Sequence, residues 1–95
     1  MLVKIRSKKE YSKGAAFRIS TTPNGIKEGD FVNIDQYTDH VVLTRVCIDA
    51  CERSVRADVN GVLRVYRSKI TGDLPTGDFE VCEESSDQDT IVFYF

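Results

Sequence analysis

Alternation of apolar and polar residues is the main pattern along this chain, and it predicts β-strands. Val3 and Ile5 alternate with basic residues near the start, and Phe17 and Ile19 alternate with small or polar residues after a turn at 12–14. Because successive side chains of a strand point to opposite faces, each of these strands has one apolar and one polar face. We therefore expect a basic hairpin whose apolar face covers a core.

The later part of the chain continues in short runs of the same kind. Residues 41–46 begin with nearly continuous apolar side chains, which predicts burial on both faces. Asn60-Gly61 is the strongest hairpin signal, because both residues tolerate positive φ angles, and it predicts strands over 54–59 and 62–67. The final run, 90–95, is apolar on both faces, which predicts a buried central strand or an interface with a partner.

The tripeptide Gly-Asp-Phe occurs twice, at 29–31 and at 77–79, and each copy reads as a tight turn that leads into a strand. After the first copy, Val32 and Ile34 are expected to face inward. After the second copy the apolar positions are shifted by one residue, which turns every side chain to the other face. The second half is therefore either a degenerate repeat with a bulge or no repeat at all.

About eight short strands with turns between them indicate an all-β fold, a small antiparallel barrel or sandwich with at most one or two short helical turns. The 95 residues suit a single domain, 1–95. No apolar run approaches the roughly 20 residues of a membrane helix. The first residues carry charges and lack the apolar core of a secretory signal, so we expect a soluble, cytoplasmic protein.

Charge is distributed unevenly along the chain, although the net charge is only −2. Residues 1–20 carry six basic side chains and one acidic side chain, whereas residues 72–95 carry seven acidic side chains and no basic one. Binding to a polyanion depends on the local field of one face, which can be positive on an acidic protein. The basic end is therefore the candidate functional surface.

The first half resembles a known family in the order of its segments. A basic strand is followed by Gly14-Ala15-Ala16-Phe17-Arg18-Ile19-Ser20, by the turn at 25–34 and by a strand at 41–46. This order is similar to the AbrB/MazE swapped-hairpin family of transcription regulators and antitoxins, over residues 2–46, although Ser20 stands where the family usually has proline. The resemblance implies a cradle-loop barrel, AbrB-like or of the related double-psi type. Residues 1–46 would form the AbrB-like half and 47–95 a second β half.

The resemblance also implies double-stranded DNA as the partner of the basic hairpin. Arg18 matches the Arg-Ile position of the family, and the other residues match as a basic strand. Arginine can read guanine edges through two parallel hydrogen bonds, whereas lysine supplies a point charge. The same residues could instead form a solvated outer face that discourages aggregation. The candidate nucleic-acid-binding residues are Lys4, Arg6, Lys8, Lys9, Lys13 and Arg18.

The sequence bears on two other classes of function. A protein-binding module, antitoxin-like or an inhibitor, could act through the acidic segment 83–89 or the apolar terminal strand, and a homodimer could form through the same strand. Catalysis is not expected, because His40 lies in a predicted turn with no nucleophile motif near it. Nor is a metal or cofactor, because the three cysteines (Cys47, Cys51 and Cys82) lack the paired spacing of a zinc site.

Overall fold

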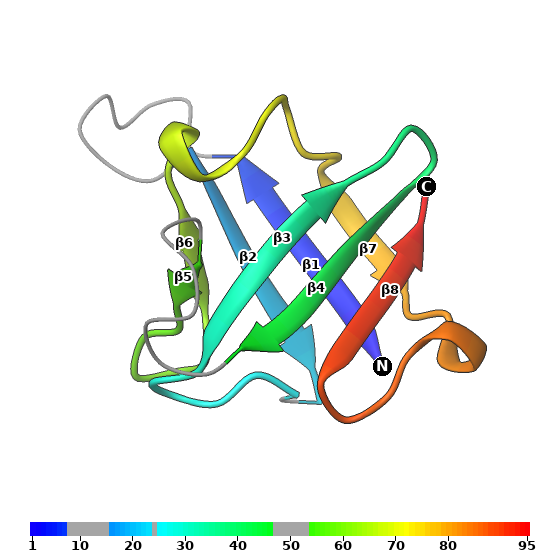
Figure 1. The fold of residues 1–95 in the computed structure, drawn as a ribbon, viewed down its shortest axis with the longest axis horizontal. Helices are drawn as coiled ribbons and strands as arrows, with labels where there is room; N and C mark the ends of the chain where they lie inside the picture. The colour runs from blue at the N-terminus through cyan, green and yellow to red at the C-terminus, as the bar shows by residue number, and fades with distance from the viewer. Residues whose placement is uncertain (8–15, 24, 47–53) are drawn as a thin grey trace.

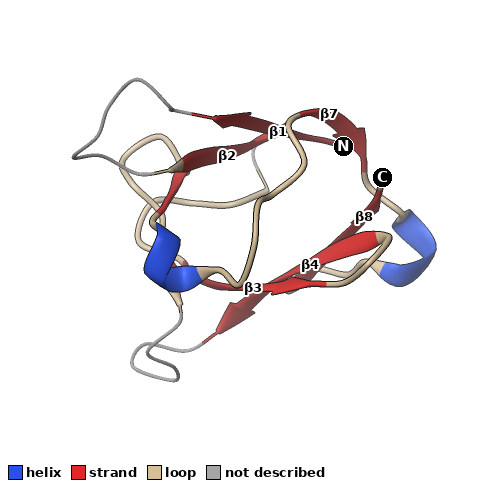
Figure 2. Ribbon diagram, turned by 90° about the horizontal axis from the view of Figure 1, so that it is seen from above, coloured by secondary structure: helices blue, strands red, loops and turns tan. Residues whose placement is uncertain are grey.

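The computed structural model describes residues 1–7, 16–23, 25–46 and 54–95, which form two facing antiparallel sheets (Figures 1 and 2). Sheet A has the order β6 (Leu63–Val65), β2 (Phe17–Thr22), β1 (Leu2–Ser7), β7 (Gly77–Glu80). Sheet B has the order β5 (Val55–Arg56), β3 (Phe31–Gln36), β4 (His40–Val46), β8 (Thr90–Tyr94). Two 3-10 turns, η1 (Arg67–Lys69) and η2 (Glu83–Ser85), are the helical elements of the described residues. The predicted all-β fold is confirmed.

Both halves of the sequence contribute to both sheets. Sheet A combines β1 and β2 with β6 and β7, and sheet B combines β3 and β4 with β5 and β8. Among the described residues, one bridge joins the sheets at each edge, between Ala57 and Leu63 on one side and between Val81 and Phe93 on the other. The strands therefore surround one core without closing into a continuous barrel.

The predicted alternation places the core between the sheets. Val3 and Ile5 of β1 are fully buried, as are Ile19 of β2 and Leu43 of β4. The expected inward positions Val32 and Ile34 are also buried. Burying these apolar side chains is the main favourable term for bringing the two sheets together.

Two strand predictions need correction. In β4 burial alternates, with Val41 and Leu43 buried and Val42 half-buried, because sheet B has its second face on the outside of the molecule. The terminal strand β8 lies at the end of sheet B, so the prediction of a central strand is wrong. Its inner face still buries Phe93 completely, and the segment before it covers part of its edge, where the Cys82 amide donates to the Val92 carbonyl (2.7 Å).

The first Gly-Asp pair lies in a turn as predicted, whereas the second lies within a strand, since Gly77 and Asp78 begin β7 and pair with β1. Gly29 and Gly77 both adopt positive φ angles (86° and 130°), which side chains other than glycine rarely tolerate. Asp30 closes its own turn by accepting the Lys27 amide (2.9 Å) before the internal strand β3. Asp78 lies within the edge strand β7 and bonds to Arg6 instead.

Candidate functional site

The predicted basic residues of β1 and β2 lie on the outer face of sheet A. Val3 and Ile5 point into the core, so Lys4 and Arg6 alternate outward. Arg18 is the residue on β2 that pairs with Arg6 in the strand register. Three of the six predicted binding residues therefore share one face. Lys8, Lys9 and Lys13 lie outside the described residues.

A third arginine extends this pair into a row. Arg64 of β6 is the register partner of Arg18, so Arg6, Arg18 and Arg64 lie side by side across three neighbouring strands. Adjacent strands are separated by about 4.8 Å, so the three backbones span roughly 10 Å.

The row continues across the edge where the sheets meet. The bridge between Ala57 and Leu63 joins β5 to β6, and Figure 1 shows these strands beside each other. One position further along the same antiparallel register, Arg56 lies level with Arg64, and both side chains are exposed. We call the four residues Arg6, Arg18, Arg64 and Arg56 the arginine arc.

Two acidic side chains hold members of the arc in place. Arg6 Nη2 lies 2.7 Å from Asp78 Oδ1, and its Nη1 donates to the Gly77 carbonyl (3.1 Å). Arg64 Nε lies 3.3 Å from Asp58 Oδ2. The arginine side chains of these ion pairs are 57% and 56% exposed, so both pairs can exchange with a ligand at little cost.

Asp58 owes its position to the turn that joins β5 and β6. Partial burial alone would raise the pKa of its carboxyl group, but the amides of Asn60 and Val62 and the Arg64 guanidinium lower the pKa below its usual value. The two amides donate to Asp58 Oδ1 at 2.9 and 3.1 Å. The carboxylate therefore stays charged beside Arg64.

Like charges at paired positions of neighbouring strands are destabilising. Arg18 lies between two other arginines, and within the described parts of the chain it makes no ion pair. An anion placed over the row would relieve this repulsion. The outer face of sheet A is therefore electrostatically suited to a polyanion.

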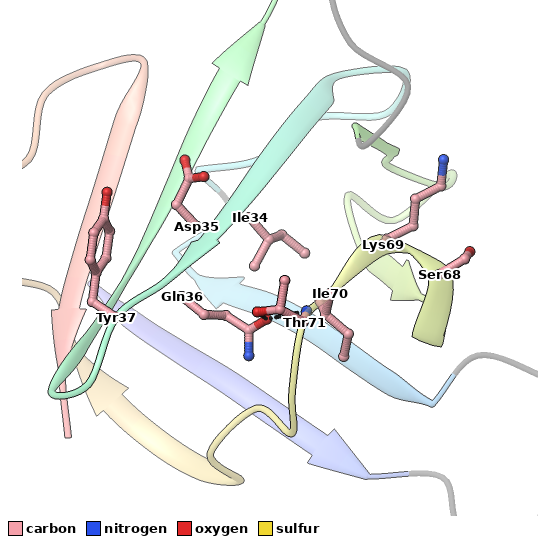
Figure 3. Close-up of a pocket in the computed structure, with 8 residues that line it drawn as sticks. All are labelled: Ile34, Asp35, Gln36, Tyr37, Ser68, Lys69, Ile70 and Thr71. Atoms are coloured by element: carbon pink, nitrogen blue, oxygen red, sulfur yellow. Dashed lines mark hydrogen bonds between the residues drawn. The ribbon is translucent and has the colours of Figure 1, made fainter.

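A cavity of about 270 Å³ lies where the end of β3 meets the segment after η1 (Figure 3). Gln36 crosses it: its Oε1 accepts the Thr71 amide (2.9 Å), and its Nε2 donates to the Gly72 carbonyl (3.2 Å). These bonds tie the connection between η1 and β7 to sheet B. They give Gln36 a structural role in the cavity wall.

Arg45 joins two turns at the opposite end of the strands. Its Nε lies 3.1 Å from Asp30, its Nη2 donates to the Gly25 carbonyl (2.8 Å), and its Nη1 lies 3.5 Å from Asp89. The side chain is 33% exposed, so these contacts are partly shielded from water. Arg45 is thus engaged in holding the fold.

Tyr37 and Tyr94 flank His40 at the start of β4, and we call these three residues together with Phe95 the aromatic rim. The His40 ring stacks on Tyr37 with centroids 4.5 Å apart and lies 4.9 Å from the Tyr94 ring. Its Nδ1 is 2.6 Å from Asp39, and this hydrogen bond lowers the pKa of the Asp39 carboxyl group. Tyr37, Tyr94 and the adjacent Phe95 are each about half exposed. The rim offers apolar surface but contains no reactive nucleophile.

The described residues hold no cluster of three metal-ligating side chains. Cys82 is a half-buried free thiol, and Cys47 and Cys51 lie outside the described residues. No helix in the described part of the chain is long and apolar enough to cross a bilayer.

Sequence reasoning missed Arg64 and Arg56 as members of the basic surface. The available signal was the Asn60-Gly61 hairpin together with the inward residues Leu63 and Val65, which turn Arg64 outward. The pairing of β6 with β2 was not predictable from local pattern, because it joins positions about 45 residues apart.

Comparison with protein-family models gave no match. Searches of curated proteins and of solved structures also gave no match. The resemblance to the AbrB/MazE family therefore stays a prediction.

Proposed function

We propose that this protein is a small DNA-binding regulator that holds the phosphate backbone with the outer face of sheet A. The arginine arc is the observation that carries the proposal, because four guanidinium groups on successive strands match the repeated charges of a nucleic acid backbone. Lys4 lies on the same face, whereas Lys8, Lys9 and Lys13 belong to the proposal by sequence alone and lie outside the described residues.

Neutralising phosphates releases counterions, so binding should weaken steeply with salt. If Arg6, Arg18 and Arg64 each neutralise one phosphate of a duplex, affinity should fall about 40-fold between roughly 50 and 200 mM salt. Fluorescence anisotropy of a labelled random duplex measures this dependence.

The variant Arg18→Gln tests the centre of the arc, and Lys27→Gln is its control. Both substitutions remove one positive charge, but Lys27 lies in the turn before β3 and is not part of the strands of sheet A. We expect Arg18→Gln to weaken binding and to lower the number of neutralised phosphates, obtained from the slope of log affinity against log salt, by about one. Lys27→Gln should change neither quantity. Equal effects of the two variants would contradict a localised site.

Asp78→Asn provides a test in the opposite direction. The substitution removes a negative charge from the face and frees Arg6 from its ion pair. We expect DNA affinity to rise by up to about fivefold, since an exposed ion pair contributes about 1 kcal/mol or less. A loss of affinity would argue against Arg6 as a DNA contact.

A second candidate function is protein binding through the aromatic rim, with a second copy of the chain as one candidate partner. Its support is the exposure of Tyr37, Tyr94 and Phe95 beside the edge strand β8. Exposed aromatic side chains that lie close together are suited to a contact with another protein chain. The acidic segment 83–89 is less suited to binding a partner, because its Asp89 already forms an ion pair with Arg45.

A further inference from the structure

An exposed tyrosine lies beside the arginine arc, two residues after Arg64 along the chain. Tyr66 directly follows β6 with an extended backbone (φ −89°, ψ 154°), so it continues the alternation in which Arg64 points outward and Val65 inward. Tyr66 is 49% exposed. Ala16, directly before β2, is the register neighbour of Tyr66: its amide donates to the Val65 carbonyl (2.8 Å), and its side chain packs against the core.

The arc itself follows a convex surface. It runs from the middle of sheet A across the bridge between Ala57 and Leu63 to β5, which belongs to sheet B (Figure 1). Three strand spacings give it a length of about 14 Å. A DNA duplex is stiff over roughly 150 base pairs and touches such a curve over a short stretch only. A flexible single strand can follow it.

We infer that the preferred ligand is a single-stranded nucleic acid, whose phosphates lie along the arginine arc while one base stacks on Tyr66. The inference rests on the proposed function, since it uses the same surface and adds the form of the ligand. Proteins that bind single strands without sequence preference combine a basic track with aromatic rings on which bases stack. Here the ring and the arc share the strand β6, because Tyr66 lies two residues after Arg64.

The absence of tryptophan from the sequence allows a direct test of stacking. Tyr66→Trp introduces a single tryptophan beside the arc, which can be excited selectively over the remaining tyrosines, and Tyr37→Trp introduces one in the aromatic rim on sheet B as the matched control. Each protein is titrated at about 50 mM salt with a 12-residue oligo(dT), with a duplex of the same length and with inorganic polyphosphate. Circular dichroism checks that both variants are folded.

We expect oligo(dT) to quench the tryptophan at position 66 and to leave the one at position 37 unchanged. Polyphosphate should compete with oligo(dT) without quenching, because it has charges but no bases. Stacking of one base predicts affinity at least about fivefold higher for oligo(dT) than for the duplex. Tyr66→Ser should lose this preference, and Tyr66→Phe should keep it.

Equal or tighter binding of the duplex, or an unquenched tryptophan at position 66 in the oligo(dT) complex, would overturn the single-strand inference. The proposed function would survive that result if duplex binding remained sensitive to salt and to Arg18→Gln. Failure of both nucleic acids to bind at about 50 mM salt would overturn both proposals, since electrostatic binding is strongest at low salt.

Discussion

Asp58 illustrates how one side chain serves both the fold and the candidate site. Its carboxylate accepts two amides of the turn between β5 and β6, where Gly61 has a φ angle of 72°, and it also contacts Arg64. The turn fixes the bridge between Ala57 and Leu63, and that bridge brings Arg56 level with Arg64. The continuity of the arginine arc therefore depends on a residue outside it.

Replacing Asp58 with alanine removes both hydrogen bonds to the turn. We expect the free energy of unfolding to fall by about 1–2 kcal/mol, since a side-chain hydrogen bond contributes about 0.5–1.5 kcal/mol. Urea unfolding at neutral pH measures the change. Glu28→Ala, an exposed acidic site elsewhere, should shift the free energy by no more than about 0.5 kcal/mol. Equal losses in the two variants would contradict the role of the turn.

The lowered pKa of Asp58 also predicts a dependence of stability on pH. As pH falls, the Asp58 carboxyl group takes up its proton near the usual pKa of 3.8 in the unfolded chain and only at lower pH in the folded chain. Between these two pKa values the unfolded chain therefore binds more protons than the folded chain. The stabilisation is therefore present above the unfolded pKa and is lost as pH falls through the lower folded pKa. Asp58→Asn should show a shallower loss of stability on acidification than the wild type. A parallel pH profile in urea unfolding would contradict this assignment.

At the scale of elements, β8 combines an edge position with a buried face. Phe93 is fully buried against Phe79, with ring centroids 5.1 Å apart, while the next residue, Tyr94, is half exposed. The Val81–Phe93 bridge and the Cys82–Val92 hydrogen bond attach β8 to the end of sheet A. This strand therefore holds the second edge of the two-sheet structure together.

Substitutions at two adjacent residues of β8 test its buried face and its exposed face separately. Phe93→Ala should lower the free energy of unfolding by about 3–5 kcal/mol, because it removes a buried ring and leaves a cavity. Tyr94→Ala should cost about 1 kcal/mol or less, because the ring is half exposed and its main contact is His40. Thermal or urea unfolding of both variants measures the difference. Similar losses would mean that β8 is not packed as described.

At the scale of the whole molecule, folding mixes charges that the sequence keeps apart. Asp73, Asp78 and Asp89, all in the acidic last quarter of the chain, pair with Arg67, Arg6 and Arg45. The acidic segment is therefore partly neutralised by arginines from the rest of the chain. The positive face that remains is defined by strand pairing and contains residues from both halves of the sequence.

The aromatic rim gives a prediction about assembly. If a homodimer forms through β8 and the rim, Tyr94→Ser with Phe95→Ser should shift the protein from dimer to monomer, because these rings supply exposed apolar surface. Size-exclusion chromatography with light scattering over a range of concentrations measures the mass. Arg18→Gln on sheet A should leave the mass unchanged. A wild-type protein that stays monomeric at high concentration would exclude this dimer.

The sequence by itself determined the local structure, because alternation and turn chemistry act over a few residues. It predicted the all-β class, the inward positions Val3, Ile5, Val32 and Ile34, and the outward placement of Lys4, Arg6 and Arg18. These follow from the period of a strand and the need to bury apolar side chains.

Only the tertiary structure decided which strands are neighbours. Pairing of β2 with β6 placed Arg64 beside Arg18, the Ala57–Leu63 bridge added Arg56, and β8 took an edge rather than a central place. Strand order depends on the joint packing of side chains from distant segments, and the local pattern is compatible with several orders. The arginine arc is therefore a product of the fold, although each of its members faces outward for a reason already present in the sequence.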